Sequence, residues 1–265
     1  MKIVDFDKLS VLNLHYCQYT LDYFLDCMQE LGIKNVELLG GHQGLWLDPN
    51  EYQDPEPVRK KLQEHGLKCP VFTPQNCRFG YQFGVKEPEL REKTFGFFAN
   101  AIRLGAALGA DKMEANSGWG YWDEAEEDGL KRAAEMHQRL CEVAEENGVT
   151  IVAESLRPQE SRIGYSLRFK VMIDLTAMSV SGETIQQWFD VFGKENIVHA
   201  HFQDCDPYGH YIWGEGKRNL RKDLEDMVKN GYEGYFTQEL TAPAYYLDPF
   251  RYDKRNVQNL RMYME

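Results

Sequence analysis

The sequence contains neither a membrane-spanning segment nor the basic character that a nucleic-acid partner requires. It has no apolar run of the roughly 20 residues that cross a bilayer. Its start, MKIVDFDKLS, lacks the basic and apolar segments and the cleavage site of a signal peptide. The net charge of −12 opposes phosphate binding, because nucleic-acid affinity depends on clustered Lys and Arg. We therefore expect a cytoplasmic protein that binds neither membranes nor nucleic acid.

Cysteine pairs at metal-binding or redox spacing are absent as well. No CxxC motif occurs, and no low-complexity tract or Pro/Gly linker divides the chain. In a reducing compartment the cysteines are most simply small buried or surface residues. Cys205 lies in the most polar motif, where a reactive thiol is the weaker alternative. The six cysteines are Cys17, Cys27, Cys69, Cys77, Cys141 and Cys205.

Length and composition favour one α/β barrel over two small domains. The chain has 265 residues, of which 43% are hydrophobic and 27% charged. That balance builds a large core with a solvated surface, and a (β/α)8 barrel has about 250 residues. We predict a single TIM-barrel domain over residues 1–265.

Short apolar runs alternate with amphipathic helical stretches along the chain, as in strand-crossover-strand units with a parallel sheet. Eight strands, the number that closes a small barrel, are predicted. Glycines follow most of the helices, at the position that favours a left-handed conformation. The predicted strands are Val11–Tyr16, Asn35–Leu39, Lys68–Thr73, Asp111–Ala115, Thr150–Ser155, Lys170–Asp174, Ile197–Gln203 and Gly234–Glu239. The predicted helices are Leu21–Leu31, Pro57–His65, Pro88–Leu108, Glu124–Asn147, Glu183–Phe192, Leu220–Asn230 and Pro249–Met264.

The connection between the fifth and sixth strands is abnormally short. It reads LRPQESRIGYSLRF, whereas a parallel crossover usually takes a dozen or more residues and a helix. Either the barrel lacks its fifth outer helix, or a segment near Leu167–Arg168 is missing from the sequence. The second alternative is slightly favoured, because losing a covering helix would expose apolar sheet surface.

Four ionisable residues stand at the ends of the last four predicted strands. The fifth strand ends in IVAE, the sixth in VMID, the seventh carries VHAHFQD and the eighth ends in FTQE. Barrel active sites lie at the carboxyl ends of the strands, so these side chains should converge there. The alternative, that each merely caps its strand or pairs with a Lys or Arg, explains one such residue better than four. The four residues are Glu154, Asp174, His201 and Glu239.

Three carboxylates and one imidazole form an oxygen-rich site that suits a single divalent metal ion. Mn²⁺ is the first choice, with Co²⁺, Mg²⁺ and Zn²⁺ as alternatives. His199 shares a strand face with His201, so it should contact substrate or support a ligand, with a core histidine as the alternative. His210 lies in the loop GHYIWGEG, a kind of loop that can close over a sugar but is also a common barrel connection.

Several motifs resemble the sugar phosphate isomerase/epimerase superfamily of xylose isomerase-like barrels. They are ESLRPQES, VMIDLTA, VHAHFQD, HYIWGEG and GYEGYFTQEL. The resemblance runs nearly end to end, since NVELLGG and VFTPQN near the start fit it too. Within the superfamily the chain is most similar to the fructoselysine 3-epimerases, and more distantly to the tagatose and psicose 3-epimerases.

This resemblance implies roles for individual residues. Glu154, Asp174, His201 and Glu239 would hold the metal, and Glu154 and Glu239 would also be the acid/base pair. Glu160 matches a carboxylate near the substrate. Two departures from the tagatose-type pattern, Ala177 in place of a histidine and Pro207 in place of an arginine, make a plain hexulose a less secure substrate.

The predicted reaction is inversion at carbon 3 of a small ketose or ketose-amine through a cis-enediolate that the metal stabilises. The runner-up is an aldose-ketose isomerase, in which the proton moves between adjacent carbons. An endonuclease IV-like repair enzyme is disfavoured by the acidic charge and the few histidines, and a non-catalytic sugar-binding barrel by the complete metal set. Because no phosphate-binding loop follows the last two strands, an unphosphorylated sugar is favoured. The family resemblance also implies a homo-oligomer.

Overall fold

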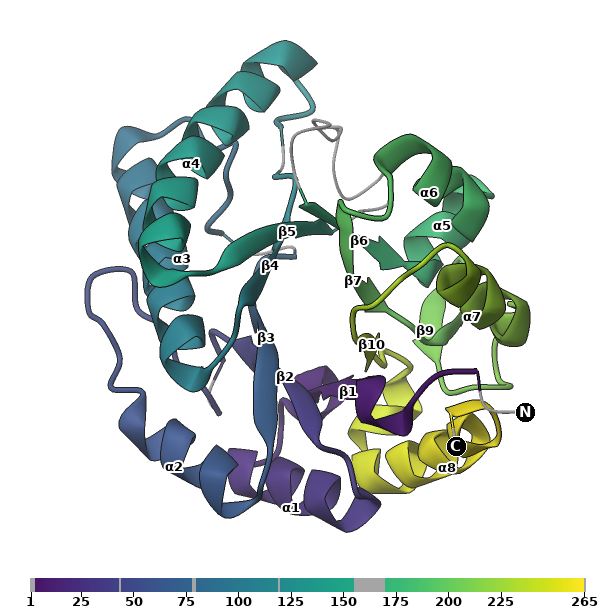
Figure 1. Cartoon of the computed structure of the whole chain (residues 1–265). Helices are drawn as coiled ribbons and strands as arrows, with labels where there is room; N and C mark the ends of the chain where they lie inside the picture. Colours follow the sequence, from purple (N-terminus) through teal and green to yellow (C-terminus); the bar gives the residue numbers. More distant parts are fainter. Residues whose placement is uncertain (1–2, 43, 78–79, 119, 155–169, 265) are drawn as a thin grey trace. The chain divides into compact units, whose positions relative to one another are not determined.

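A computed structural model describes residues 3–42, 44–77, 80–118, 120–154 and 170–264. Eight parallel strands close into a barrel in the order β1-β10-β7-β6-β5-β4-β3-β2 (Figure 1). The predicted TIM-barrel fold is thereby confirmed. The barrel strands are β1 (Leu9–Leu12), β2 (Asn35–Gly40), β3 (Lys68–Pro74), β4 (Lys112–Asn116), β5 (Thr150–Glu154), β6 (Lys170–Asp174), β7 (Ile197–His201) and β10 (Phe236–Gln238). Two further strands, β8 (Asp204–Asp206) and β9 (Gly209–Tyr211), form a separate antiparallel pair.

Helices alternate with these strands, and short 3-10 segments flank some of them. The α-helices are α1 (Leu21–Leu31), α2 (Glu56–Glu64), α3 (Pro88–Leu108), α4 (Glu126–Asn147), α5 (Leu175–Ser181), α6 (Ile185–Phe192), α7 (Leu220–Lys229) and α8 (Pro249–Met264). The 3-10 segments are η1 (Phe6–Lys8), η2 (Asn13–Tyr16) and η3 (Pro243–Tyr246). Among the described residues, no helix combines the length and apolarity that crossing a membrane would require.

Local chemistry explains where the helices begin and end. The Thr20 hydroxyl accepts a hydrogen bond from the Tyr23 amide and so caps the start of α1. Gly32 follows α1 with a φ of 72°, a left-handed conformation that a residue with a Cβ adopts at a cost. Thr184 and Gln187 form a reciprocal capping box at the start of α6. The predicted helices 21–31, 88–108 and 249–264 have the same bounds in the structure.

Three predicted strands extend beyond the observed strands at their carboxyl ends. The first was predicted over Val11–Tyr16, but β1 ends at Leu12 and the next four residues form η2. The seventh was predicted to reach Gln203, but β7 ends at His201, and the eighth was predicted over Gly234–Glu239, but β10 covers only Phe236–Gln238. In each case the strand ends where its pairing with the neighbouring strands ends, and the residues beyond that point (NLHY, FQ and E) do not mark the end by their hydrophobicity. The short helix α5 was missed because the Asp174 side chain caps it directly at the end of β6.

The chain's internal contacts divide it into two compact units. The first comprises Met1–Glu37, Lys61–Lys68 and Val171–Glu265, and the second Leu38–Lys60 and Cys69–Lys170. The single domain inferred from the sequence stays a prediction. The short connection between the fifth and sixth strands falls on residues 155–169, outside the described residues, and so does Glu160.

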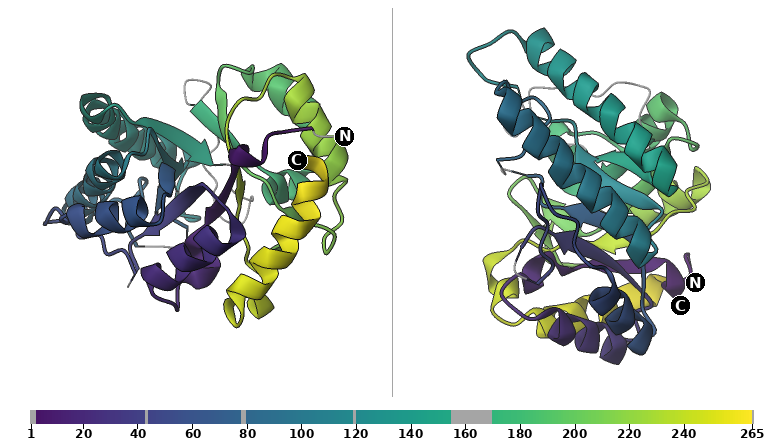
Figure 2. Two further views of the ribbon diagram at one scale, coloured as in Figure 1. Left: turned by 60° about the horizontal axis from the view of Figure 1, so that its bottom comes forward. Right: turned by 90° about the vertical axis from the view of Figure 1, so that its left-hand side faces the viewer.

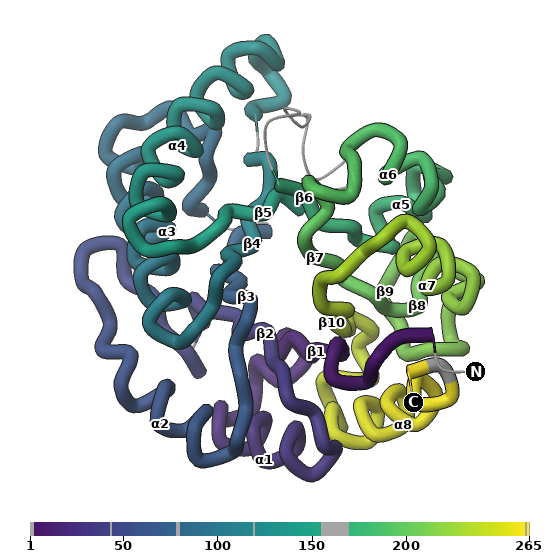
Figure 3. Tube along the Cα trace, in the orientation of Figure 1, coloured from purple at the N-terminus to yellow at the C-terminus, as the bar shows by residue number. Residues whose placement is uncertain are grey.

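Within the first unit, β1 pairs in parallel with both β2 and β10, so the first and last barrel strands are neighbours (Figure 3). Helix α8 packs against α1 in the same unit. Within the second unit, β4 lies between β3 and β5 in parallel register. There α3 and α4 lie side by side (Figure 2), and the Phe83 ring packs against Phe98 of α3 and His137 of α4.

Candidate active site

Three of the predicted site residues lie together in the first unit, at the carboxyl ends of neighbouring strands. Asp174 ends β6 and His201 ends β7, and the two are partners in the strand register. Glu239 directly follows β10. His201 Nδ1 lies 3.3 Å from Glu239 Oε2 and 4.0 Å from Asp174 Oδ2. One imidazole nitrogen therefore faces two carboxylates.

Asp174 is held by both of its carboxylate oxygens. Its Oδ1 accepts a 2.7 Å hydrogen bond from the Ala177 amide at the start of α5. Its Oδ2 accepts a 3.1 Å bond from the Gln203 side-chain amide. The side chain is only 4% exposed. The start of α5 therefore fixes the orientation of this carboxylate, and the positive end of that short helix faces it.

Glu239 is paired with histidines and is largely buried. His210 Nδ1 lies 2.8 Å from Glu239 Oε2, and each side chain is 15% exposed. Burial alone would raise the pKa of Glu239, but His210 and His201 outweigh it and hold this pKa well below its usual range. Burial alone would lower the pKa of His210, and the nearby Glu239 carboxylate reverses that effect and raises it. Glu239 is therefore an ionised carboxylate beside an imidazole.

The loop that carries His210 is organised around one buried carboxylate. Asp204 Oδ1 accepts hydrogen bonds from the backbone amides of Cys205 and Arg218, and Oδ2 accepts one from Gly214. A Cβ at Gly216 would lie 2.5 Å from the Cys205 nitrogen, so the backbone approaches too closely for a side chain there. These contacts fold the segment after β7 into a defined extension beside β10.

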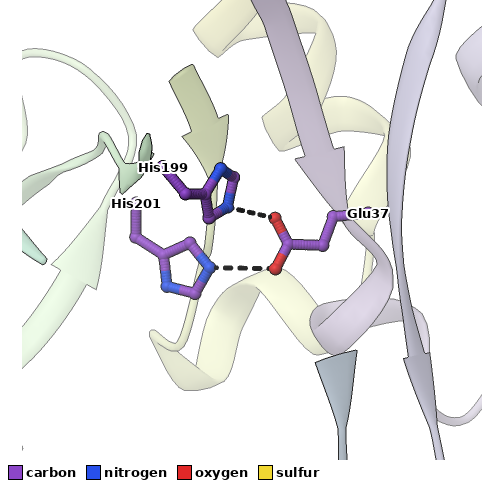
Figure 4. Close-up of side chains that lie close together, drawn as sticks. All are labelled: Glu37, His199 and His201. Atoms are coloured by element: carbon purple, nitrogen blue, oxygen red, sulfur yellow. Dashed lines mark hydrogen bonds and ion pairs between the residues drawn. The ribbon is translucent and has the colours of Figure 1, made fainter. Parts of the chain in front are cut away.

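A second cluster adjoins the first through His201. Glu37, on β2, points its carboxylate toward both His199 and His201 (Figure 4). His199 Nε2 is 2.8 Å from Glu37 Oε2, and His201 Nε2 is 3.2 Å from Glu37 Oε1. All three side chains are at most 1% exposed. Burial alone would raise the pKa of Glu37, but the two histidines outweigh it and hold this pKa well below its usual range.

Glu37 lies within the predicted second strand, Asn35–Leu39, and the sequence indicated no partner for it. The sequence contains an indication that this residue is unusual, because one carboxylate interrupts the largely apolar strand NVELLG. In the structure every residue of β2 is buried. A buried carboxylate needs partners, and only the fold identifies them as two histidines more than 160 residues away along the chain.

Glu154 is the last residue of β5 and belongs to the second unit, where it is partly exposed and pairs in register with Asn116. Cys205 is fully buried, 3.2 Å from the Ser179 hydroxyl. Burial raises the pKa of its thiol to about 11. The preferred interpretation of Cys205 as a structural residue agrees with this environment.

The donor atoms of the first unit fit a hard divalent cation. Asp174, His201 and Glu239 each offer one ligand atom, and these atoms lie within 4.8 Å of one another. Two carboxylates aimed at one nitrogen repel each other unless a positive charge lies among them. Oxygen-rich sets with one imidazole are typical of Mn²⁺ and Mg²⁺ sites, with Co²⁺ and Zn²⁺ also compatible.

Comparison with known proteins gives consistent results. The model of the xylose isomerase-like TIM barrel family matches residues 25–261. The chain is 27% identical to fructoselysine 3-epimerase from Shigella flexneri, covering 96% of this chain and 97% of that protein. It is structurally similar to D-psicose 3-epimerase from Clostridium cellulolyticum H10, with a TM-score of 0.75 at 15% identity, covering 97% and 99%. It is also similar to 3-keto-D-glucoside 4-epimerase from E. coli, with a TM-score of 0.77 at 16% identity, covering 96% and 99%.

Proposed function

The chain belongs to the xylose isomerase-like TIM barrel family and is an enzyme of the sugar epimerase/isomerase type, and we propose that it inverts carbon 3 of a ketose or ketose-amine sugar. The observation that carries this proposal is the convergence of Asp174, His201 and Glu239 at the carboxyl ends of three barrel strands. The similarity to a fructoselysine 3-epimerase across almost the whole of both chains supports a substrate of that class.

The proposed metal ligands are Glu154, Asp174, His201 and Glu239. β5 ends on Glu154 just as β6 ends on Asp174, which supports its inclusion with the three residues of the first unit. The proposed ion is Mn²⁺, and when bound it would polarise the sugar carbonyl and offset the negative charge that develops beside it.

Glu239 and Glu154 are the proposed acid/base pair. Glu239 is suited to accept a proton, because His201 and His210 keep it ionised despite its burial. When Glu239 takes the proton at carbon 3 the product is a planar enediolate, and a protonated Glu154 then donates its own proton to the opposite face and inverts that carbon, which leaves Glu239 protonated and Glu154 ionised. If one carboxylate instead carried the proton between carbons 1 and 2, the same residues would interconvert an aldose and a ketose. That isomerase remains the runner-up.

Three residues were expected to contact the sugar. His210 keeps that proposed role, because it is partly exposed and lies against Glu239. His199 is fully buried on Glu37, so we assign it an indirect role through that carboxylate. Glu160 lies outside the described residues, and its proposed role rests on the family resemblance. An unphosphorylated sugar and a homo-oligomeric enzyme stay part of the proposal.

The acid/base assignment is tested with E239Q and E154Q, which keep the side-chain shape and remove the base. Each variant, assayed at a Mn²⁺ concentration at which EPR shows one bound ion per chain, should lose at least about a hundredfold in turnover, the usual contribution of a positioned acid or base, while still binding sugar. Turnover is followed by NMR, and binding by calorimetry with the metal-loaded protein. E225Q, on the exposed face of α7, is the matched control and should keep full activity. A variant that retains more than about a hundredth of the parent activity removes its glutamate from the pair.

A further inference from the structure

The carboxylate of Glu37 is enclosed by protein and is shared between two histidines. Each histidine approaches a different oxygen, His199 at Oε2 and His201 at Oε1, and both do so through Nε2 (Figure 4). The Glu37 and His199 side chains are 0% exposed and that of His201 is 1% exposed. A carboxylate in such a place requires hydrogen-bond donors on its oxygens.

The hydrogen count of this arrangement fixes the histidine tautomers. An ionised carboxylate only accepts hydrogen bonds, so each Nε2 must carry the hydrogen. A carboxyl group that kept its own proton would instead donate it to one Nε2 and accept a hydrogen bond from the other, so only one of the two Nε2 atoms would then carry a hydrogen. A neutral imidazole has a single N–H, and with that hydrogen on Nε2 the Nδ1 atom presents its lone pair. For His201, Nδ1 is the atom 3.3 Å from Glu239 and 4.0 Å from Asp174.

We propose that Glu37 is a positioning residue that keeps the hydrogen of His201 on Nε2 and thereby turns the Nδ1 lone pair toward Asp174 and Glu239. The inference rests on the proposed function, since it is there that a cation is held by these atoms. A hydrogen-bonded carboxylate behind a ligand histidine also makes the imidazole a stronger donor to a metal. Glu37 itself would touch neither the ion nor the sugar.

His199 has the complementary task of fixing the carboxylate. It makes the shorter of the two hydrogen bonds, at 2.8 Å against 3.2 Å. The hydrogen bond from His199 to one oxygen opposes rotation of the carboxylate away from His201. The two histidines lie on the same strand, two residues apart, and their ring centroids are 5.6 Å apart.

The same three residues are close enough together to hold a cation of their own. Direct hydrogen bonds between these residues are favoured over a bound cation, because each Nε2 faces a separate oxygen at an ordinary hydrogen-bond distance. The two arrangements differ in metal stoichiometry. A cation held by Glu37, His199 and His201 would add a second equivalent, whereas the positioning role adds none.

The test compares wild type, E37Q and E114Q. Glutamine at position 37 keeps the shape but has one oxygen and one donor, so it cannot accept from both Nε2 atoms. Glu114 is a buried carboxylate whose Oε1 accepts a hydrogen bond from the Asn76 side-chain amide, so E114Q applies the same change at a buried glutamate outside the cluster of Glu37, His199 and His201. Mn²⁺ binding is measured by EPR, and the hydrogen on each ring nitrogen by NMR of ¹⁵N-histidine-labelled, metal-free protein at pH 8. Circular dichroism checks that each variant is folded.

We expect wild type to bind one Mn²⁺ per chain and to carry a hydrogen on Nε2 of both His199 and His201. E37Q should bind Mn²⁺ about 10- to 100-fold more weakly, the usual effect of losing such a supporting residue, with altered ring-nitrogen signals. E114Q should match wild type in both measurements. The Glu37 role is overturned if His201 carries its hydrogen on Nδ1 alone, if E37Q binds Mn²⁺ as wild type does, or if E37Q loses only a second equivalent. A wild type that binds no Mn²⁺ would instead overturn the proposed metal site, and with it the inference that rests on that site.

Discussion

Replacing Asp174 by asparagine separates the two tasks of this residue, which caps α5 and is a proposed metal ligand. Asparagine caps helices about as well as aspartate, so Oδ1 of the new side chain can still accept from the Ala177 amide. The new NH₂ group would face the amide of Gln203, which now donates to Oδ2. Gln203 can turn its amide over and present its oxygen, so metal-free D174N should be nearly as stable as wild type.

The metal-dependent part of the stability should behave differently. A ligand present at a hundred times its dissociation constant stabilises the folded state by about 2.7 kcal/mol. For a chain of this size that corresponds to a rise in melting temperature of roughly 5–10 °C. D174N removes a charged ligand, so most of this rise should vanish. D174A should lose the rise and also the cap, which costs about 1 kcal/mol more, or roughly 2–4 °C.

Thermal melts of wild type, D174N and D174A, with EDTA and with Mn²⁺, provide the assay. Wild type should gain several degrees with Mn²⁺, and D174N should melt like wild type in EDTA but gain little. If D174N kept the full Mn²⁺-induced rise, Asp174 would not be a ligand. If D174A and D174N had the same melting temperature in EDTA, the cap at position 174 would contribute nothing to stability.

Two further predictions concern the segment after β7. Arg218 donates from Nε and Nη2 to both oxygens of Asp223, with each side chain 13% exposed, so R218K should lose roughly 1–3 kcal/mol of unfolding free energy. The exposed counterpart R221K should change the free energy of unfolding, measured in urea, by less than about 0.5 kcal/mol. Equal losses of unfolding free energy in R218K and R221K would refute the argument from burial. Since burial raises the pKa of Cys205 to about 11, its thiolate is scarce at neutral pH, and iodoacetamide should label it slowly in the folded protein at pH 8 and readily after unfolding. Peptide mass mapping that found rapid labelling of folded protein at pH 8 would contradict this environment.

The barrel was predictable because the spacing of hydrophobic residues and the positions of glycines indicate the same helices and strands along the chain. Helices such as 88–108 have a proline at the start and a glycine after the end, and both signals are local. The ends of strands were harder to predict. The residues NLHY after β1 form η2, but their mixture of polar and apolar side chains does not distinguish them from a strand, so only pairing with β2 and β10 determines that β1 stops at Leu12.

The candidate site was predictable to the extent that its residues end apolar strands. Asp174, His201 and Glu239 were identified in this way, and their ligand atoms lie together. The link from Glu37 to the two histidines could not be predicted, because it joins residues far apart in sequence across the barrel interior. The contact of His210 with Glu239 depends on the Asp204-centred loop, whose hydrogen bonds have no periodic signature.

The most direct test of the proposed reaction is to strip the protein of metal and incubate it in deuterated water with fructoselysine, fructose and related ketoses, with and without Mn²⁺. NMR then follows each sugar carbon. The account predicts Mn²⁺-dependent deuterium incorporation at carbon 3, together with the appearance of the epimer. Incorporation at carbon 1 or 2 would identify an isomerase instead, and the absence of exchange at any carbon of any sugar would contradict the proposed epimerase activity.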